Sequence, residues 1–129
     1  MNNHTPEWKM YDERELFNRI HRHILREKLF LNPAFSRQDI IALGLPNRNV
    51  AARLIREFTH TNFNGYINAL RLDYARTLMQ LRPGIPIKIL AFNAGFNSVR
   101  TFNRAFVQRY GQTPSEYREV QVSGTLRHT

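Results

Sequence analysis

Apolar residues recur every three or four positions in seven stretches of the chain, which is the spacing of a helix that buries one face. Turn-forming residues separate these stretches, which cover residues 11–30, 36–43, 47–59, 63–81, 86–94, 98–110 and 113–120. No run of useful length is rich in Val, Ile and Thr and alternates apolar with polar residues, as a half-buried strand requires. The pattern therefore predicts an all-α fold with about seven helices.

Residues that prefer helix ends mark the boundaries of these stretches. Four polar residues stand where N-caps are expected: Ser36, Asn47, Ser98 and Thr113. The first and the last of them have an acid three residues further on, which is typical of a capping box. Gly44, Gly95 and Gly111 follow helical stretches, as glycines at helix C-termini do. We therefore expect helices to begin and end close to these residues.

A short helix, a glycine-containing turn and an arginine-rich helix occur near residues 37–59 and again near 86–110. This order is typical of a helix-turn-helix. The predicted organisation is a leader (1–10), a first helix-turn-helix subdomain (11–62), a linker helix (63–82), a second helix-turn-helix subdomain (83–120) and a disordered tail (121–129).

The length of the predicted linker helix has a consequence for binding. At about 1.5 Å per residue, a helix over residues 63–81 is roughly 28 Å long. Consecutive major grooves on one side of DNA lie about 34 Å apart. We therefore expect one chain to read two consecutive grooves of an asymmetric site, with some bending of the duplex.

The net charge of +9 is concentrated in the middle of the chain. Residues 46–112 hold ten basic residues and two acids, whereas the first 36 residues hold six basic residues and five acids. Sixteen of the 19 Lys and Arg residues are arginine, whose guanidinium pairs bidentately with phosphate and with guanine. The charge therefore favours a nucleic acid as partner over the alternative of a merely solvated basic surface.

The outward faces of the two arginine-rich helices carry similar side chains. If residues 51, 54, 55 and 58 are buried, the opposite face displays Arg48, Asn49, Ala52, Arg53 and Arg56. If residues 102, 105, 106 and 110 are buried, the second helix displays Val99, Arg100, Asn103, Arg104 and Val107. Arg reads guanine, Asn reads adenine, and small apolar groups suit the thymine methyl. Because the same kind of face occurs twice, we interpret it as a surface that reads the major groove.

Other classes of function find less support in the residues. The chain has no cysteine, and His21 and His23 lie on different faces of a helix, so neither an enzyme nor a metal or cofactor site is expected. A basic helical module that binds proteins or a membrane surface stays an alternative, as does RNA binding. Both would place aromatic residues outward beside the arginines, whereas the aromatics here fall on the predicted buried stripes. Without a signal peptide or a long apolar run, a cytoplasmic protein is expected.

The stretch from Gly84 to Arg118 resembles the signature of the AraC/XylS family of bacterial transcription regulators. The matching residues, in order and without a gap, are Ile87, Ala91, Gly95, Phe96, Ser98, Phe102, Arg104, Phe106, Gly111, Pro114, Tyr117 and Arg118. The resemblance is weaker in the first half, where "FNGYINALRLDYA" carries it, and covers roughly residues 11–120. Two departures stand out: His60 replaces a glycine, and the turn at Pro46-Asn47 is one residue longer.

The resemblance implies sequence-specific binding of double-stranded DNA through two helix-turn-helix subdomains joined by a long helix. It also implies transcriptional activation through RNA polymerase in most members. The base-contacting residues it implies are Asn47, Arg48, Asn49, Ala52, Arg53, Val99, Arg100, Asn103 and Arg104. Arg56 and the helix starts at Ser36 and Thr113 are expected to contact phosphates, because helix N-termini attract anions.

Most members of this family carry a separate ligand-sensing or signalling domain, for which this sequence shows no counterpart. The charge-balanced first helix favours a fragment of a longer protein over a stand-alone regulator. No contact of this domain with a membrane is expected.

Overall fold

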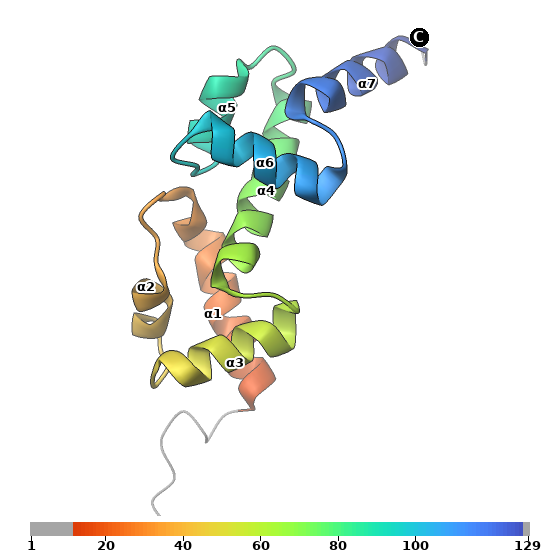
Figure 1. The fold of residues 1–129 in the computed structure, drawn as a ribbon. Coiled ribbons are helices and arrows are strands. Elements are labelled where there is room, and N and C mark those ends of the chain that lie inside the picture. Colours follow the sequence, from red (N-terminus) through yellow and green to blue (C-terminus); the bar gives the residue numbers. More distant parts are fainter. Residues whose placement is uncertain (1–11, 128–129) are drawn as a thin grey trace, which may run out of the picture. The chain divides into compact units, whose positions relative to one another are not determined.

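The computed structural model describes residues 12–127, and their side chains as far as residue 121. This part of the chain is all-α and has no strand (Figure 1). Its elements are α1 (Glu13–Glu27), the 3-10 helix η2 (Leu29–Leu31), α2 (Arg37–Ala42), α3 (Arg48–Thr59), α4 (Phe63–Leu81), α5 (Ile87–Asn93), α6 (Val99–Tyr110) and α7 (Pro114–Arg127). The predicted fold class is thus confirmed, whereas the predicted leader lies outside the described residues.

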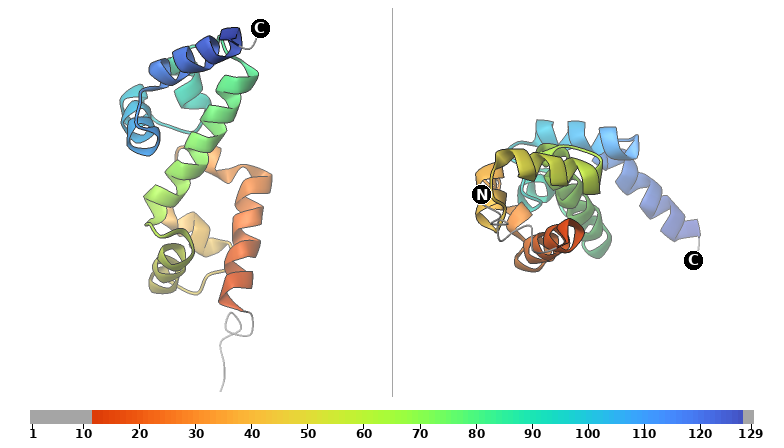
Figure 2. Two further views of the ribbon diagram at one scale, coloured as in Figure 1. Left: turned by 90° about the vertical axis from the view of Figure 1, so that its right-hand side faces the viewer. Right: turned by 90° about the horizontal axis from the view of Figure 1, so that it is seen from below.

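The chain forms two compact units, Met1–Ile67 and Asn68–Thr129. The boundary falls inside α4, which is one continuous helix (Figure 2, left). The sequence predicts a linker helix over residues 63–82, close to the bounds of α4. In the structure each end of this helix supplies buried side chains to the unit that it belongs to.

Side-chain caps fix the starts of the helices where the sequence places them. The Ser36 hydroxyl accepts from the backbone N–H of Asp39, whose carboxylate accepts in turn from the backbone N–H of Ser36. Asn47 and Ser98 accept from the third residue of α3 and α6, respectively. The Thr113 hydroxyl accepts from the N–H of Glu116 in the same way. Each bond satisfies a donor that a helix start leaves without a partner.

The core of the first unit is formed by α1, α3 and the start of α4. Leu16, Ile20 and Ile24 of α1 are buried, as are Leu54 and Ile55 of α3. Leu25 of the same helix is 41% exposed, whereas Phe17 is buried. Phe17 stacks on Phe58 of α3, with ring centroids 5.4 Å apart.

A polar contact lies beside this core. His21 Nδ1 and the Tyr66 hydroxyl are 2.6 Å apart and join α1 to α4 inside the first unit. Burial lowers the pKa of His21 and raises the pKa of Tyr66 well above its usual range. Burial therefore favours a hydrogen bond between a neutral imidazole and a protonated phenol.

The core of the second unit is built around aromatic rings of α6. Phe102 and Phe106 are fully buried, and Phe96 of the preceding turn packs on Phe102 at a centroid distance of 5.3 Å. At the end of α6, Asp73 of α4 accepts from the Tyr110 hydroxyl at 2.9 Å and pairs with Arg109 at 3.1 Å. The expected burial of residues 102 and 106 is confirmed, whereas residues 105 and 110 are partly buried.

Two features differ from the expectations. The buried residues of α4 are Phe63, Tyr66 and Ile67 before the unit boundary, and Leu72, Ala75 and Met79 after it. The predicted helix over residues 63–81 is present, but its buried residues do not form one stripe, because its two ends belong to different cores; Leu81 is 75% exposed. In addition, α7 continues to Arg127, where the sequence predicts a disordered tail, since no proline stops the helical hydrogen bonds.

Candidate nucleic-acid interface

Helices α3 and α6 have the same local design. Each is 12 residues long, follows an N-cap whose side chain accepts from the third residue of the helix, and ends at a residue with left-handed backbone. The terminal residues are His60 (φ 60°) and Gly111 (φ 76°). Positions in the two helices can therefore be compared by their distance from the N-cap, so that Arg53 corresponds to Arg104 and Arg56 to Val107.

The outward face of α6 presents two exposed arginines. Arg100 and Arg104 are exposed, and Val99 and Asn103 beside them are partly buried. Within the described part of the chain, neither arginine forms an ion pair. The structure thus brings the four predicted residues of the second unit to one end of one helix, with both guanidinium groups open to a ligand.

The outward face of α3 is similar at its start. Arg48, Asn49, Ala52 and Arg56 are all exposed. Asn47 is exposed as well, but its Oδ1 accepts from the backbone N–H of Val50 at 3.0 Å. Bidentate reading of adenine by asparagine needs that same oxygen. The cap occupies one of the two lone pairs of this oxygen and fixes its direction, whereas the NH₂ group stays available to DNA.

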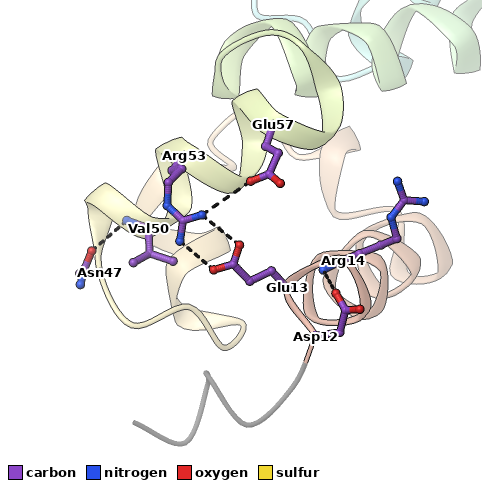
Figure 3. Close-up of polar contacts among 7 residues, drawn as sticks. All are labelled: Asp12, Glu13, Arg14, Asn47, Val50, Arg53 and Glu57. Atoms are coloured by element: carbon purple, nitrogen blue, oxygen red, sulfur yellow. Dashed lines mark hydrogen bonds and ion pairs between the residues drawn. The ribbon is translucent and has the colours of Figure 1, made fainter. Parts of the chain in front are cut away.

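Arg53, also predicted to contact a base, is bound within the protein (Figure 3). Its Nη1 and Nη2 donate to the two carboxylate oxygens of Glu13 at 3.0 and 2.9 Å. Glu57, one turn further along α3, lies 3.6 Å from Nη1. The hydrogen bond to Glu13 raises the pKa of Arg53 above its usual range. The pairing of Glu13 with Arg53 joins residues 40 apart in the sequence, and no local pattern indicates it.

The two helix starts expected to bind phosphate already hold a carboxylate. The backbone N–H and the hydroxyl of Ser36 both donate to Asp39 Oδ2, at 2.8 and 3.0 Å. The backbone N–H of Thr113 donates to Glu116 Oε1 at 2.8 Å, and this bond holds the pKa of Glu116 below its usual value. A phosphate at either position has to displace that carboxylate or bind beside it.

The structure adds one basic residue, Arg37, that the sequence pattern did not single out. Arg37, exposed at the first position of α2, lines a hollow of about 480 Å³ together with Arg48. It also lines a second hollow of about 160 Å³ together with Arg56. The sequence does hold a sign of this role, because Arg37 directly follows the N-cap Ser36 and therefore lies beside a helix start, where phosphate is expected to bind. Three arginines from α2 and α3 therefore border neighbouring hollows of the first unit.

Other kinds of site find little support in the described residues. Residues 12–127 contain no group of three His, Cys, Asp or Glu side chains placed to hold a metal ion. None of their helices is long and apolar enough to cross a membrane. One exception to the expected burial of aromatics occurs in α5, where Phe92 is 45% exposed. The aliphatic residue Ile89 of the same helix is 46% exposed.

The sequence is similar to known regulators of transcription. The model of a helix-turn-helix domain family matches residues 43–119, more than half of the chain. The transcriptional activator RclR of Escherichia coli is 30% identical over 86 residues, which are 67% of this chain and 30% of RclR. The transcriptional activator RhrA of Rhizobium meliloti is 32% identical over 101 residues, 75% of this chain and 31% of RhrA. The regulatory protein SoxS of Escherichia coli is 35% identical over 66 residues, 51% of this chain and 61% of SoxS. The chain thus spans about a third of the length of RclR and of RhrA.

Solved structures show the same fold. The C-terminal domain of the response regulator AraT from Geobacillus stearothermophilus superposes with a TM-score of 0.70 at 20% identity, covering 80% of this chain and 83% of that one. A DNA-binding transcriptional dual regulator from Escherichia coli K-12 superposes with a TM-score of 0.69 at 24% identity, covering 95% of this chain and 99% of that one.

Proposed function

Because the chain belongs to the AraC/XylS family of helix-turn-helix transcription regulators, a non-enzymatic family that binds DNA, we propose that α3 and α6 read bases in two consecutive major grooves. The observation that carries the proposal is the outward face of α6, where Arg100 and Arg104 are exposed and, among the described residues, without an ion pair. Guanidinium groups so placed are suited to guanine O6 and N7. The corresponding face of α3 supports a second contact of the same kind.

The roles of the individual residues follow from their places on the two helices. Arg48, Asn49, Ala52 and Arg53 are proposed to contact bases in the first groove, and Val99, Arg100, Asn103 and Arg104 in the second. Asn47 is proposed to contact DNA through its NH₂ group while its oxygen caps α3. Arg56 and Arg37 are proposed to bind phosphates from the sides of their hollows. Ser36 and Thr113 stay candidates for phosphate contacts once their capping carboxylates give way.

Selection of the purified protein on a random duplex library of about 30 base pairs tests this proposal. We expect an asymmetric motif with two blocks about one helical turn apart. Affinity for the selected duplex should exceed that for a scrambled one, and both should fall with added salt as phosphate contacts are screened. A single enriched block would limit base reading to one unit. No enrichment, with a steep salt dependence on every duplex, would contradict sequence-specific binding.

We further propose that the protein activates transcription through contact with RNA polymerase. The relatives RclR and RhrA are both named as transcriptional activators, which supports activation over repression. The test is transcription in vitro with purified polymerase from a promoter that carries the selected site at varied distances upstream. Activation should require the site and should depend on its distance from the promoter. Repression at every distance would contradict the proposal.

A further inference from the structure

Arg53 occupies the position of α3 that corresponds to Arg104 of α6, but two carboxylates hold it in the absence of DNA (Figure 3). Glu13, the first residue of α1, accepts from Nη1 and Nη2 with both of its oxygens. Glu57 approaches Nη1 from α3 itself at 3.6 Å. The side chains of Arg53 and Glu13 are still 49% and 36% exposed, so the group lies at the surface, where DNA can reach it.

A count of the N–H groups of Arg53 shows what remains available. A guanidinium has five N–H groups in one plane. Nη1 donates one to Glu13 and lies 3.6 Å from Glu57, and Nη2 donates one to Glu13. The Nε–H and the second N–H of Nη2 are left; they lie on the same edge of the group and point the same way. In the described part of the chain, Nε has no hydrogen-bond partner.

This free edge has the geometry needed to recognise a guanine. Two parallel N–H groups on one edge of an arginine can donate together to O6 and N7 in the major groove. An arginine without such support loses the freedom of several rotatable bonds when it docks on a base. An arginine already held by a carboxylate on its other edge loses less, and it presents the same pair of donors each time.

We propose that Glu13 is a positioning residue for DNA recognition: its carboxylate fixes Arg53 so that the Nε and Nη2 edge reads one guanine of the site. The inference rests on the proposed base-reading role of Arg53. It adds α1 to the elements that determine specificity, although α1 does not belong to the helix-turn-helix. Arg104 has no such support among the described residues and depends on the DNA to order it.

The experiment measures how well four proteins distinguish the selected site from duplexes in which one guanine at a time is replaced. The first is Arg53→Ala, whose loss of preference identifies the guanine that Arg53 reads. The others are Glu13→Gln, the double variant Glu13→Gln with Arg53→Ala, and Glu15→Gln. Glu15 is an exposed acid of the same first turn of α1 and serves as the control for removing a negative charge. For each protein, the affinity for the selected site is divided by the affinity for the substituted duplex, because this ratio does not depend on the fraction of active protein.

We expect Arg53→Ala to reduce the preference for that guanine by about tenfold or more. Glu13→Gln should reduce it by about three- to tenfold at the same base pair. In the Arg53→Ala background the Glu13 substitution should have no further effect on the preference. Glu15→Gln should strengthen binding slightly to all duplexes and leave the preference as it was.

Other outcomes would overturn the inference in different ways. If Arg53→Ala alters no base preference, the proposed role of Arg53 fails, and the role of Glu13 fails with it. If Arg53→Ala alters the preference but Glu13→Gln does not, Arg53 reads a base without help from Glu13. If Glu13→Gln strengthens binding to the selected site more than Glu15→Gln does, Glu13 competes with DNA for Arg53 and does not position it.

Discussion

Helices α3 and α6 agree in length, in their caps and in their buried faces, yet they differ in what surrounds the arginine at the sixth position. Arg53 is bound by Glu13 from α1 and lies close to Glu57. In the second unit Asp73 binds Tyr110 and Arg109 at the far end of α6, and Arg104 is exposed. The same local sequence design thus produces one arginine that carboxylates hold and one that, among the described residues, forms no ion pair. The contacts that make the difference come from neighbouring helices.

The largest expected effect is the loss of Arg104. Arg104→Ala should weaken binding to the selected site by about 1–3 kcal/mol, because it removes a bidentate contact to a base. Binding to a scrambled duplex should fall much less. Gln108→Ala, at an exposed position of the same helix, serves as the control and should leave both affinities unchanged. Equal losses on both duplexes would make Arg104 a phosphate contact.

A second difference between the helices concerns the ninth position, where α3 has Arg56 and α6 has Val107. Arg56→Ala should weaken binding to all sequences alike and lower the slope of log affinity against log salt by about one, since one phosphate contact is lost. Val107→Arg should raise the same slope by about one, because Val107 is 41% exposed on the corresponding face. Titrations at four or five salt concentrations measure both slopes. A loss with Arg56→Ala that is confined to one sequence would contradict a phosphate role.

The features that the sequence predicted well are local ones. Capping by Ser36, Asn47, Ser98 and Thr113 depends on residues at most three positions apart, so the helix starts could be placed from the sequence alone. The bond between Glu13 and Arg53 could not, because it requires α1 and α3 to be packed first. The same holds for α4, whose buried face changes where it passes from one core to the other. The predicted contacts with DNA are not tested by the fold and stay predictions.

The helix ends differ in a way that affects stability. α3 ends at His60 and α6 at Gly111, both in the left-handed region of backbone conformation. A side chain costs free energy there, so His60→Gly should raise the free energy of unfolding by about 0.5–1 kcal/mol. Gly111→Ala is the matched opposite change and should lower it by roughly 1 kcal/mol. A Cβ at Gly111 would meet no atom within 4 Å, so that loss arises from backbone conformation alone.

Urea unfolding of both variants beside the parent protein measures these two differences. The free energy of unfolding should rise in His60→Gly and fall in Gly111→Ala. If His60→Gly destabilises the protein, contacts of the imidazole outweigh the strain at the end of α3. If Gly111→Ala is neutral, the backbone at that position adapts without cost, and the comparison between the two helix ends does not hold.

The smallest expected effect is a loss of stability at low pH that affects the first unit and not the second. His21 bonds Tyr66 in the first unit, and residues 68–127 of the second unit contain no histidine. Burial lowers the pKa of His21 in the folded protein, so the unfolded chain takes up the proton first. This contribution to stability is fully present above the pKa of the unfolded chain, about 6.5. It is lost as the pH falls below that value toward the folded pKa.

Amide hydrogen exchange between pH 7.5 and 5 can follow this loss in each unit separately, once corrected for the intrinsic dependence of exchange on pH. Protection in α1 and α3 should decrease relative to protection in α6 as the pH falls. His21→Gln should remove that difference, because an amide oxygen accepts from the Tyr66 hydroxyl but does not titrate. His23→Gln, two residues away on α1, should leave it unchanged. If the difference survives His21→Gln, another group in the first unit must take up the proton, and the His21–Tyr66 contact is not what makes that unit sensitive to acid.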